Sequence, residues 1–160
     1  MIKINIICLG RLKEKYLRDA AAEYEKRLSA FAKVQIIEME PERLSDNPSD
    51  SEIEAALKTE ADKILKKIEQ GSYTAAMCIE GRQMTSEEFS GLITEKMNSG
   101  TGVFNFIIGS SCGLHELVKK AADLKFSFSK MTFPHQLFRI MLEEQLYRAF
   151  KIRDGGKYHK

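Results

Sequence analysis

The chain has 160 residues, enough for one ordinary domain with a single core and too few for two full-sized domains. Hydrophobic residues make up 43% and charged residues 30%, a composition that excludes a disordered or fibrous protein. The formal net charge is only +2, so bulk charge predicts no strong nucleic-acid binding, and any basic surface must be local.

Short apolar runs alternate with amphipathic segments from the N-terminus onwards. The first three expected elements are a strand, a helix and a strand, at residues 2–10, 12–31 and 33–40. Two prolines then mark residues 41–50 as a loop. Ser49 and Glu52 have the spacing of a capping box for a helix that runs to about Ile68.

The alternation continues to the end of the chain. Three further strands are expected at residues 73–81, 103–111 and 125–129. Thr85 and Glu88 form a second capping box, for a helix over residues 86–98, and a short helix starts near His115. The last helix runs from about Pro134 to Lys151, with Thr132 as its expected cap.

The strands read as continuous apolar runs separated by helices. This pattern indicates an α/β fold, a parallel sheet with helices on both faces. In such sheets, ligands bind beyond the carboxyl ends of the strands. Three stretches therefore become candidates for a binding site: residues 79–83 (IEGRQ), 107–114 (IIGSSCGL) and 126–133 (FSFSKMTF).

The three stretches differ in how much they indicate. Gly109 and Gly113 allow a sharp turn that presents backbone amides, but the stretch is neither a Walker motif nor a dinucleotide fingerprint, and a plain turn remains the alternative. The first stretch is weaker, because Glu80 and Arg82 can be ordinary surface charge. The third is a polar loop before an apolar helix, which is typical of a binding loop.

Apolar residues of the last helix cover more than one stripe of its surface. A helix of this kind must be covered on most of its circumference, by its own sheet and by a second subunit, so the sequence predicts a homodimer; a central core helix in a monomer is the alternative. The polar side of this helix is expected to carry Arg139, Glu143, Glu144 and Arg148, of which the last two have i, i+4 spacing.

Cysteines and termini exclude several classes of protein. Cys8, Cys78 and Cys112 form no CxxC pair, so neither a disulfide framework nor a zinc site is expected. The first apolar run is far shorter than a membrane span, and charge follows it rather than precedes it. We expect a cytoplasmic protein with no membrane partner and no metal.

Four segments of the chain resemble the ribosomal RNA large subunit methyltransferase H family of small SPOUT-class enzymes. They are residues 11–28 (RLKEKYLRDAAAEYEKRL), 106–114 (FIIGSSCGL), 124–152 (LKFSFSKMTFPHQLFRIMLEEQLYRAFKI) and the terminal YHK. The resemblance implies one SPOUT domain over residues 1–160 with a C-terminal trefoil knot and a short basic tail. It also implies methyl transfer from S-adenosylmethionine to N3 of a pseudouridine in 23S ribosomal RNA within the ribosome, by a homodimer.

The resemblance also implies site residues. The three strand-end loops would form the cofactor pocket, lined by residues 77–81, Gly109 and residues 128–133. The expected cofactor contacts are Met77, Gly109, Phe128, Ser129, Lys130, Met131, Thr132 and Phe133. Tyr158 and His159 are the catalytic candidates, to assist departure of the N3 proton or to position the base. RNA phosphates would be neutralised by Arg148, Lys151, Arg153 and Lys157, while the tail closes over the partner subunit's cofactor. His135 is interpreted as a capping or core residue.

Two other functions stay open at this point. A non-catalytic ribosome-binding or assembly module could use the basic tail, and cofactor binding would discriminate it from an enzyme. A nucleotide hydrolase is disfavoured, because the chain has no phosphate loop and no paired acids with metal-ligand spacing. For the enzyme, the modest net charge predicts that the ribosome supplies much of the recognition.

Overall fold

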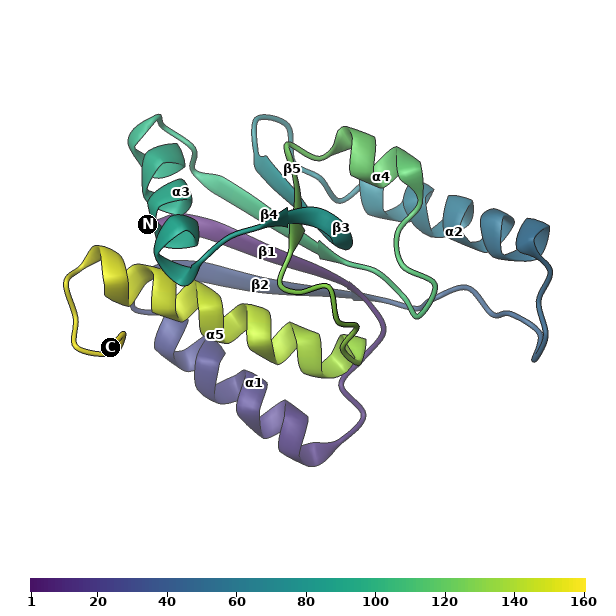
Figure 1. The fold of residues 1–160 in the computed structure, drawn as a ribbon, viewed down its shortest axis with the longest axis horizontal. Helices are drawn as coiled ribbons and strands as arrows, with labels where there is room; N and C mark the ends of the chain where they lie inside the picture. Colours follow the sequence, from purple (N-terminus) through teal and green to yellow (C-terminus); the bar gives the residue numbers. More distant parts are fainter.

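A computed structural model describes residues 1–160 (Figure 1). Strands and helices alternate along the entire chain. The elements are β1 (Ile2–Leu9), α1 (Lys15–Leu28), β2 (Ala32–Met39), α2 (Asp50–Leu65), β3 (Tyr73–Gln83), α3 (Ser86–Asn98), β4 (Val103–Ile108), α4 (Glu116–Ala121), β5 (Leu124–Ser127) and α5 (His135–Arg153). No helix is long and apolar enough to cross a membrane.

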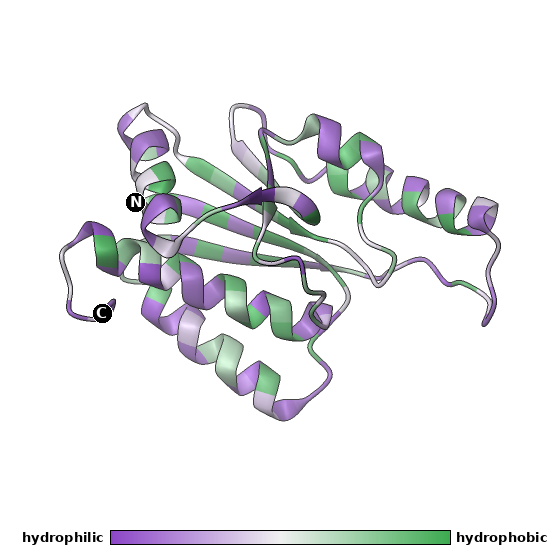
Figure 2. Ribbon diagram, viewed as in Figure 1, coloured by the Kyte–Doolittle hydropathy of each residue, from purple (hydrophilic) through white to green (hydrophobic).

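The five strands form one sheet in the order β2-β1-β4-β3-β5, and every pairing is parallel. Helices α1, α3 and α5 cover one face, and α2 and α4 cover the other (Figure 1). Alternate residues of β1 enter separate cores: Ile6 faces the α5 side and Ile7 the α2 side. Figure 2 shows the resulting concentration of hydrophobic residues along the central strands. The predicted α/β architecture is confirmed, whereas the trefoil knot stays an expectation of the family.

Helix boundaries follow the predicted caps in part. Thr85 and Glu88 form the full reciprocal capping box of α3, as predicted. Ser49 accepts a hydrogen bond from the backbone N–H of Glu52, but α2 ends at Leu65, before the expected end. The prediction that Thr132 caps α5 is wrong, because Pro134 occupies the N-cap position and no side chain caps that helix.

The structure also corrects the polar side of α5. Arg139 and Glu143 are buried, at 7% and 0% exposure, rather than facing solvent. Helix α5 packs between α1 and α3 on the sheet, so most of its circumference is covered within the same subunit (Figure 1). The apolar surface of α5 therefore requires less of a partner subunit than the sequence suggested.

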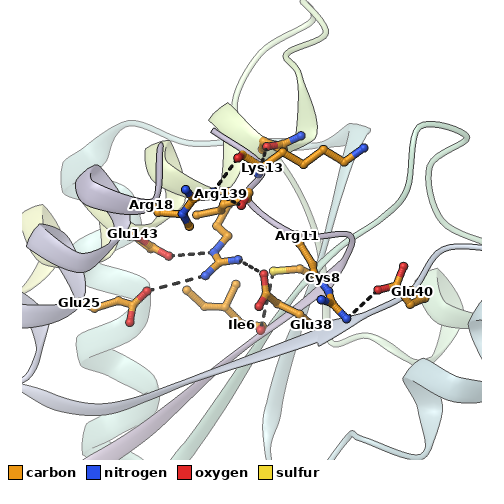
Figure 3. A network of polar contacts seen from close by, with 12 residues as sticks. Ile6, Cys8, Arg11, Lys13, Arg18, Glu25, Glu38, Glu40, Arg139 and Glu143 are labelled. Carbon is orange, nitrogen blue, oxygen red and sulfur yellow. Dashed lines mark hydrogen bonds and ion pairs between the residues drawn. The ribbon is translucent and has the colours of Figure 1, made fainter. Parts of the chain in front are cut away.

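Arg139 is surrounded by three carboxylates from three elements (Figure 3). Its guanidinium lies 3.0 Å from Glu38 on β2, 3.2 Å from Glu143 on α5 and 3.7 Å from Glu25 on α1. Burial raises the pKa of Glu143 to about 7, although Arg139 opposes the shift, and Glu143 Oε2 is buried without a hydrogen-bond partner. Glu143 therefore holds a proton in the folded state at pH values where an exposed glutamate has lost it.

The raised pKa of Glu143 predicts a pH-dependent stability. A carboxyl with a raised folded-state pKa contributes stability that is full below its unfolded value and is lost as the pH rises through about 7. Between pH 5.5 and pH 8, this group should lower the free energy of unfolding by about 2 kcal/mol. We expect Glu143→Gln to remove that fall. Urea unfolding at the two pH values measures it, with the exposed Glu95→Gln as control; an unchanged fall in Glu143→Gln would contradict the assignment.

Candidate functional site

A cavity of about 760 Å³ opens at the carboxyl ends of β4 and β5, beside the middle of β3. Its walls come from three segments far apart in the sequence, residues 77–80, 108–114 and 126–135, with Lys119 of α4 and Phe138 of α5 closing the sides. Half of the lining residues are hydrophobic. The three strand-end stretches singled out in the sequence therefore meet at one site.

All but one of the residues predicted to bind a cofactor line this cavity. They are Met77, Gly109, Phe128, Ser129, Met131, Thr132 and Phe133. Lys130 is the exception, because it is exposed and lies outside the lining. The geometry therefore does not support the prediction that Lys130 contacts the cofactor.

A bulge in β3 shapes one wall. Both Met77 and Arg82 pair with Phe126 of β5, so the four residues between them leave the ladder, and three of these, residues 78–80, line the cavity. A Cβ atom at Gly81 would lie 2.6 Å from the backbone nitrogen of Phe126, closer than real Cβ atoms approach. Glycine at this position is what allows β3 to pass so close to β5.

The turn after β4 forms the second wall. Gly113 has φ +83° and donates its N–H to the carbonyl of Ser110 over 2.9 Å. A Cβ atom at Gly109 would lie 2.6 Å from the carbonyl carbon of Gly113. Both glycines are therefore needed, one for its backbone conformation and one for the close approach across the turn.

The polar loop after β5 is held by its own hydroxyls. Ser127 Oγ donates to the carbonyl of Ser129 over 2.9 Å, and Ser129 Oγ accepts from the backbone N–H of Met131 over 3.0 Å. Phe128 packs against Phe138 with ring centroids 4.8 Å apart. The serines thus order the loop, and the exposed Met131 and Thr132 remain free to contact a ligand.

Sequence reasoning missed several lining residues. Glu80 and Lys119 form an ion pair at the cavity; Glu80 belongs to a stretch that the sequence singled out, with surface charge as the alternative, whereas Lys119 was not predicted. Lys119 lies on the short helix α4, and nothing in its local sequence indicates a site. His135 lines the cavity as well, rather than being only a core or capping residue. For Glu80 the available signal was its place in the IEGRQ stretch, just beyond the buried residues 74–77 of β3.

The cysteines have unequal environments. Cys78 and the exposed Cys112 line the cavity, while Cys8 is buried beneath Arg139. Burial raises the pKa of Cys8 to about 12, so this thiol stays protonated. No group of three or more His, Cys, Asp or Glu residues is arranged to hold a metal ion.

Tyr158 and His159 lie together but outside the cavity. The Tyr158 hydroxyl donates to Glu144 Oε1 over 3.0 Å, and Arg148 lies over its ring at 4.7 Å. The His159 ring lies 2.7 Å from Glu87 Oε1 and 3.2 Å from Arg148 Nη1. We call these five residues the tail cluster. Figure 1 shows the tail at the end of α5 opposite the helix start that lines the cavity.

The environment of Tyr158 limits its chemistry. Burial, followed by the hydrogen bond to Glu144, raises the pKa of Tyr158 to about 12. The phenol is therefore protonated near neutral pH and acts as a hydrogen-bond donor. It does not suit the task of a general base, so of the two predicted catalytic residues only His159 stays a candidate for that task.

The predicted phosphate-binding residues separate into two pairs. Arg148 pairs with Glu144 through Nε at 3.0 Å and Nη2 at 2.5 Å, and Arg153 pairs with Asp154 at 2.8 Å. Lys151 and Lys157 make no ion pair. Arg148 is thus engaged in the tail cluster, whereas the two lysines are free to meet phosphates.

A second, smaller cavity of about 430 Å³ lies beside the first. Phe126 and Phe128 belong to the walls of both cavities, and Glu144 and Gln145 of α5 line the second. The second cavity therefore occupies the space between the main cavity and the tail cluster.

Comparison with known proteins decides the family. A family model described as "Predicted SPOUT methyltransferase" matches residues 2–159. The chain belongs to the SPOUT methyltransferase family. Proteins named "Ribosomal RNA large subunit methyltransferase H" from Streptococcus uberis and Streptococcus agalactiae are each 48% identical to this SPOUT methyltransferase over 159 residues, which cover 99% of the chain and 100% of each relative.

A solved structure supports the fold of this SPOUT methyltransferase. It is titled as a probable methylase family protein from Haemophilus influenzae Rd KW20, and it matches with a TM-score of 0.53 at 13% identity. The match covers 99% of this chain and 70% of that protein. At this identity, the likeness concerns the fold alone.

Proposed function

We propose that this SPOUT methyltransferase transfers a methyl group from S-adenosylmethionine to N3 of a pseudouridine in 23S ribosomal RNA, within the ribosome. The observation that carries the proposal is the meeting of the three strand-end segments in one cavity. The full-length relatives at 48% identity, named as large-subunit ribosomal RNA methyltransferases, support the choice of substrate.

The cavity fits the proposed methyl donor in size and chemistry. Its volume of about 760 Å³ suits a nucleoside with an amino-acid arm. Met77, Ile108 and Phe133 offer apolar walls for adenine, and the tight turn that Gly109 and Gly113 permit lines the same cavity. The ion pair of Glu80 and Lys119 offers charges of both signs to the amino-acid arm.

The protein's part in the reaction is mainly alignment. When bound, the sulfonium of S-adenosylmethionine supplies an already activated methyl group. The residues of the cavity must hold N3 in line with that methyl and exclude water, which can contribute about 7–11 kcal/mol to lowering the barrier. His159 would accept the N3 proton, and Tyr158 would donate a hydrogen bond to the base edge or hold the tail in place.

The position of the tail supports a homodimer as part of the proposal. Phe138 lines the cavity, but Glu144, which holds Tyr158, lies six residues later, about 9 Å further along α5. We propose that the tail of one subunit serves the cavity of the other. Lys151 and Lys157 would then contact RNA phosphates beside the composite site.

Calorimetric titration of S-adenosylmethionine and S-adenosylhomocysteine tests the cofactor. We expect one site per subunit. Methyl transfer to ribosomes, with mapping of the modified atom, tests the reaction; ribosomes whose target uridine has not been converted to pseudouridine are the control. Absence of cofactor binding at millimolar concentration, with ribosome binding retained, would indicate a non-catalytic ribosome-binding module. Equal activity on protein-free RNA would contradict recognition through the ribosome.

A further inference from the structure

The loop between β1 and α1, together with the first turn of α1, carries the densest run of exposed positive charge outside the tail. Residues 11–18 contain four basic residues and one acid, in a chain whose net charge is only +2. The basic residues Arg11, Lys13, Lys15 and Arg18 are all exposed. Tyr16, among them, is 69% exposed, which is unusual for a large aromatic side chain.

The fold holds this segment in a defined shape. Leu12 and Leu17 are buried in a small core that includes Ile140 of α5, so the residues between and beside them point outward. Arg18 donates to the backbone carbonyls of Leu12 at 3.2 Å and Lys13 at 2.6 Å. Arg18 therefore stabilises the loop between β1 and α1 through hydrogen bonds to backbone carbonyls. It has no carboxylate partner, so its positive charge is not neutralised.

The other cations are free or weakly paired. Lys13 makes no ion pair, and Figure 3 shows its side chain extending away from the Arg139 network. The Arg11–Glu40 pair at 2.9 Å joins two side chains that are each more than 70% exposed, and Lys15 pairs with Asp19 at 2.6 Å on the outer surface of α1. Exposed pairs of this kind contribute little stability, so phosphates can replace the carboxylates.

The segment lies beside the main cavity. Because all strands are parallel, the end of β1 shares the carboxyl edge of the sheet with the ends of β3 and β4. The backbone N–H of Lys13 donates to Gln136 Oε1 over 2.8 Å, and a Cβ at Gly10 would lie 3.4 Å from Nε2 of the cavity-lining His135. The loop thus rests on the start of α5, which forms part of the cavity wall.

We propose that Arg11, Lys13, Lys15 and Tyr16 form an RNA-binding surface that holds the ribosomal RNA next to the methyl-transfer site. The lysines and the arginine contact backbone phosphates, and Tyr16 stacks on an unpaired base. This arrangement of cations around an exposed aromatic ring is typical of single-stranded RNA recognition. A membrane surface is a poorer fit, because the apolar stripe of α1, Leu17, Ala21 and Leu28, is buried.

The inference rests on the proposed function, and ribosome binding tests it separately from catalysis. The test variant combines Lys13→Gln with Lys15→Gln. The control variant combines Lys66→Gln with Lys67→Gln, which removes the same charge from two exposed lysines. These lysines follow α2, which covers the face of the sheet opposite α1. We expect the Lys13 and Lys15 variant to bind ribosomes more weakly and to raise the KM for ribosomes about tenfold. The slope of the logarithm of the binding constant against the logarithm of the salt concentration should fall in magnitude by about 1 to 2. S-adenosylmethionine affinity should not change.

Tyr16→Ala should weaken ribosome binding as well, and Tyr16→Phe should restore it, because stacking needs the ring and not the hydroxyl. The proposal is overturned if the Lys13 and Lys15 variant binds ribosomes within twofold of the wild type. It is also overturned if that variant loses binding to vesicles containing phosphatidylserine instead. A wild type that binds ribosomes without methylating them would refute the proposed function and leave this surface intact.

Discussion

Replacing Gly109 by alanine should abolish binding of S-adenosylmethionine. The added Cβ would lie 2.6 Å from the carbonyl carbon of Gly113 and 3.0 Å from Leu114 Cγ, and the first of these atoms is backbone that no rotamer change can move. The turn after β4 would have to shift, and this turn lines the cavity. We expect affinity to fall at least about a hundredfold, or about 2.7 kcal/mol, in calorimetric titration.

Gly91→Ala provides the matched control for Gly109→Ala. Gly91 lies within α3, and a Cβ there would meet no atom within 4 Å. This variant should bind the methyl donor normally and gain about 0.5–1 kcal/mol of stability, because alanine is the better helix former. Far-UV circular dichroism establishes that Gly109→Ala is folded before titration. Wild-type affinity in a folded Gly109→Ala protein would exclude this turn from the binding site.

His159→Ala should lower kcat about a hundredfold while leaving S-adenosylmethionine affinity unchanged. In the proposed function His159 accepts the N3 proton, because burial raises the pKa of Tyr158 to about 12 and keeps that phenol protonated. A positioned acceptor contributes about 10²–10⁴ in rate. His159 is not a lining residue of its own subunit's cavity, so its removal leaves every wall residue of that cavity in place. Single-turnover methyl transfer to ribosomes measures the rate, with Lys160→Gln as the neighbouring control.

Mixing the two inactive variants tests whether the site is shared between subunits. Gly109→Ala retains an intact tail, and His159→Ala retains an intact cavity. Random exchange would place both intact parts together at about a quarter of the sites. We therefore expect about a quarter of wild-type activity after mixing. No recovery, despite subunit exchange demonstrated by native mass spectrometry, would show that each tail serves its own subunit.

Much of the fold follows from local pattern. Strand β4 is apolar except for Asn105 and pairs on both edges, and the capping box of Thr85 and Glu88 determines the start of α3 through contacts within one turn. Gly109 and Phe128 could be assigned to the cavity because parallel strands bring their carboxyl ends to one edge. These predictions needed only short-range rules and one rule of topology.

The errors arose where distant residues decide the outcome. Arg139 is buried because Glu38, 101 positions earlier, supplies a carboxylate, and no periodicity within α5 reveals that partner. Arg148 pairs with Glu144 and lies 3.2 Å from His159 of the tail, contacts that its sequence position did not indicate, while its contact with RNA stays a prediction. Lys130 lies in the loop after β5 that lines the cavity, but Lys130 itself is not a lining residue. The direction of a loop side chain depends on backbone contacts that the sequence does not specify.

The pairing of β1 with β4 has a consequence for synthesis of the chain. Residues 3–8 lie beside residues 103–108, so the first strand to leave the ribosome must wait for about a hundred further residues before its second edge is covered. At about 5–20 residues per second, this delay lasts about 5–20 s. During that time β2 can shield only one side of an apolar segment. The sheet can therefore be completed only after most of the chain has been synthesised, and until then the nascent protein depends on chaperones to protect its apolar segments.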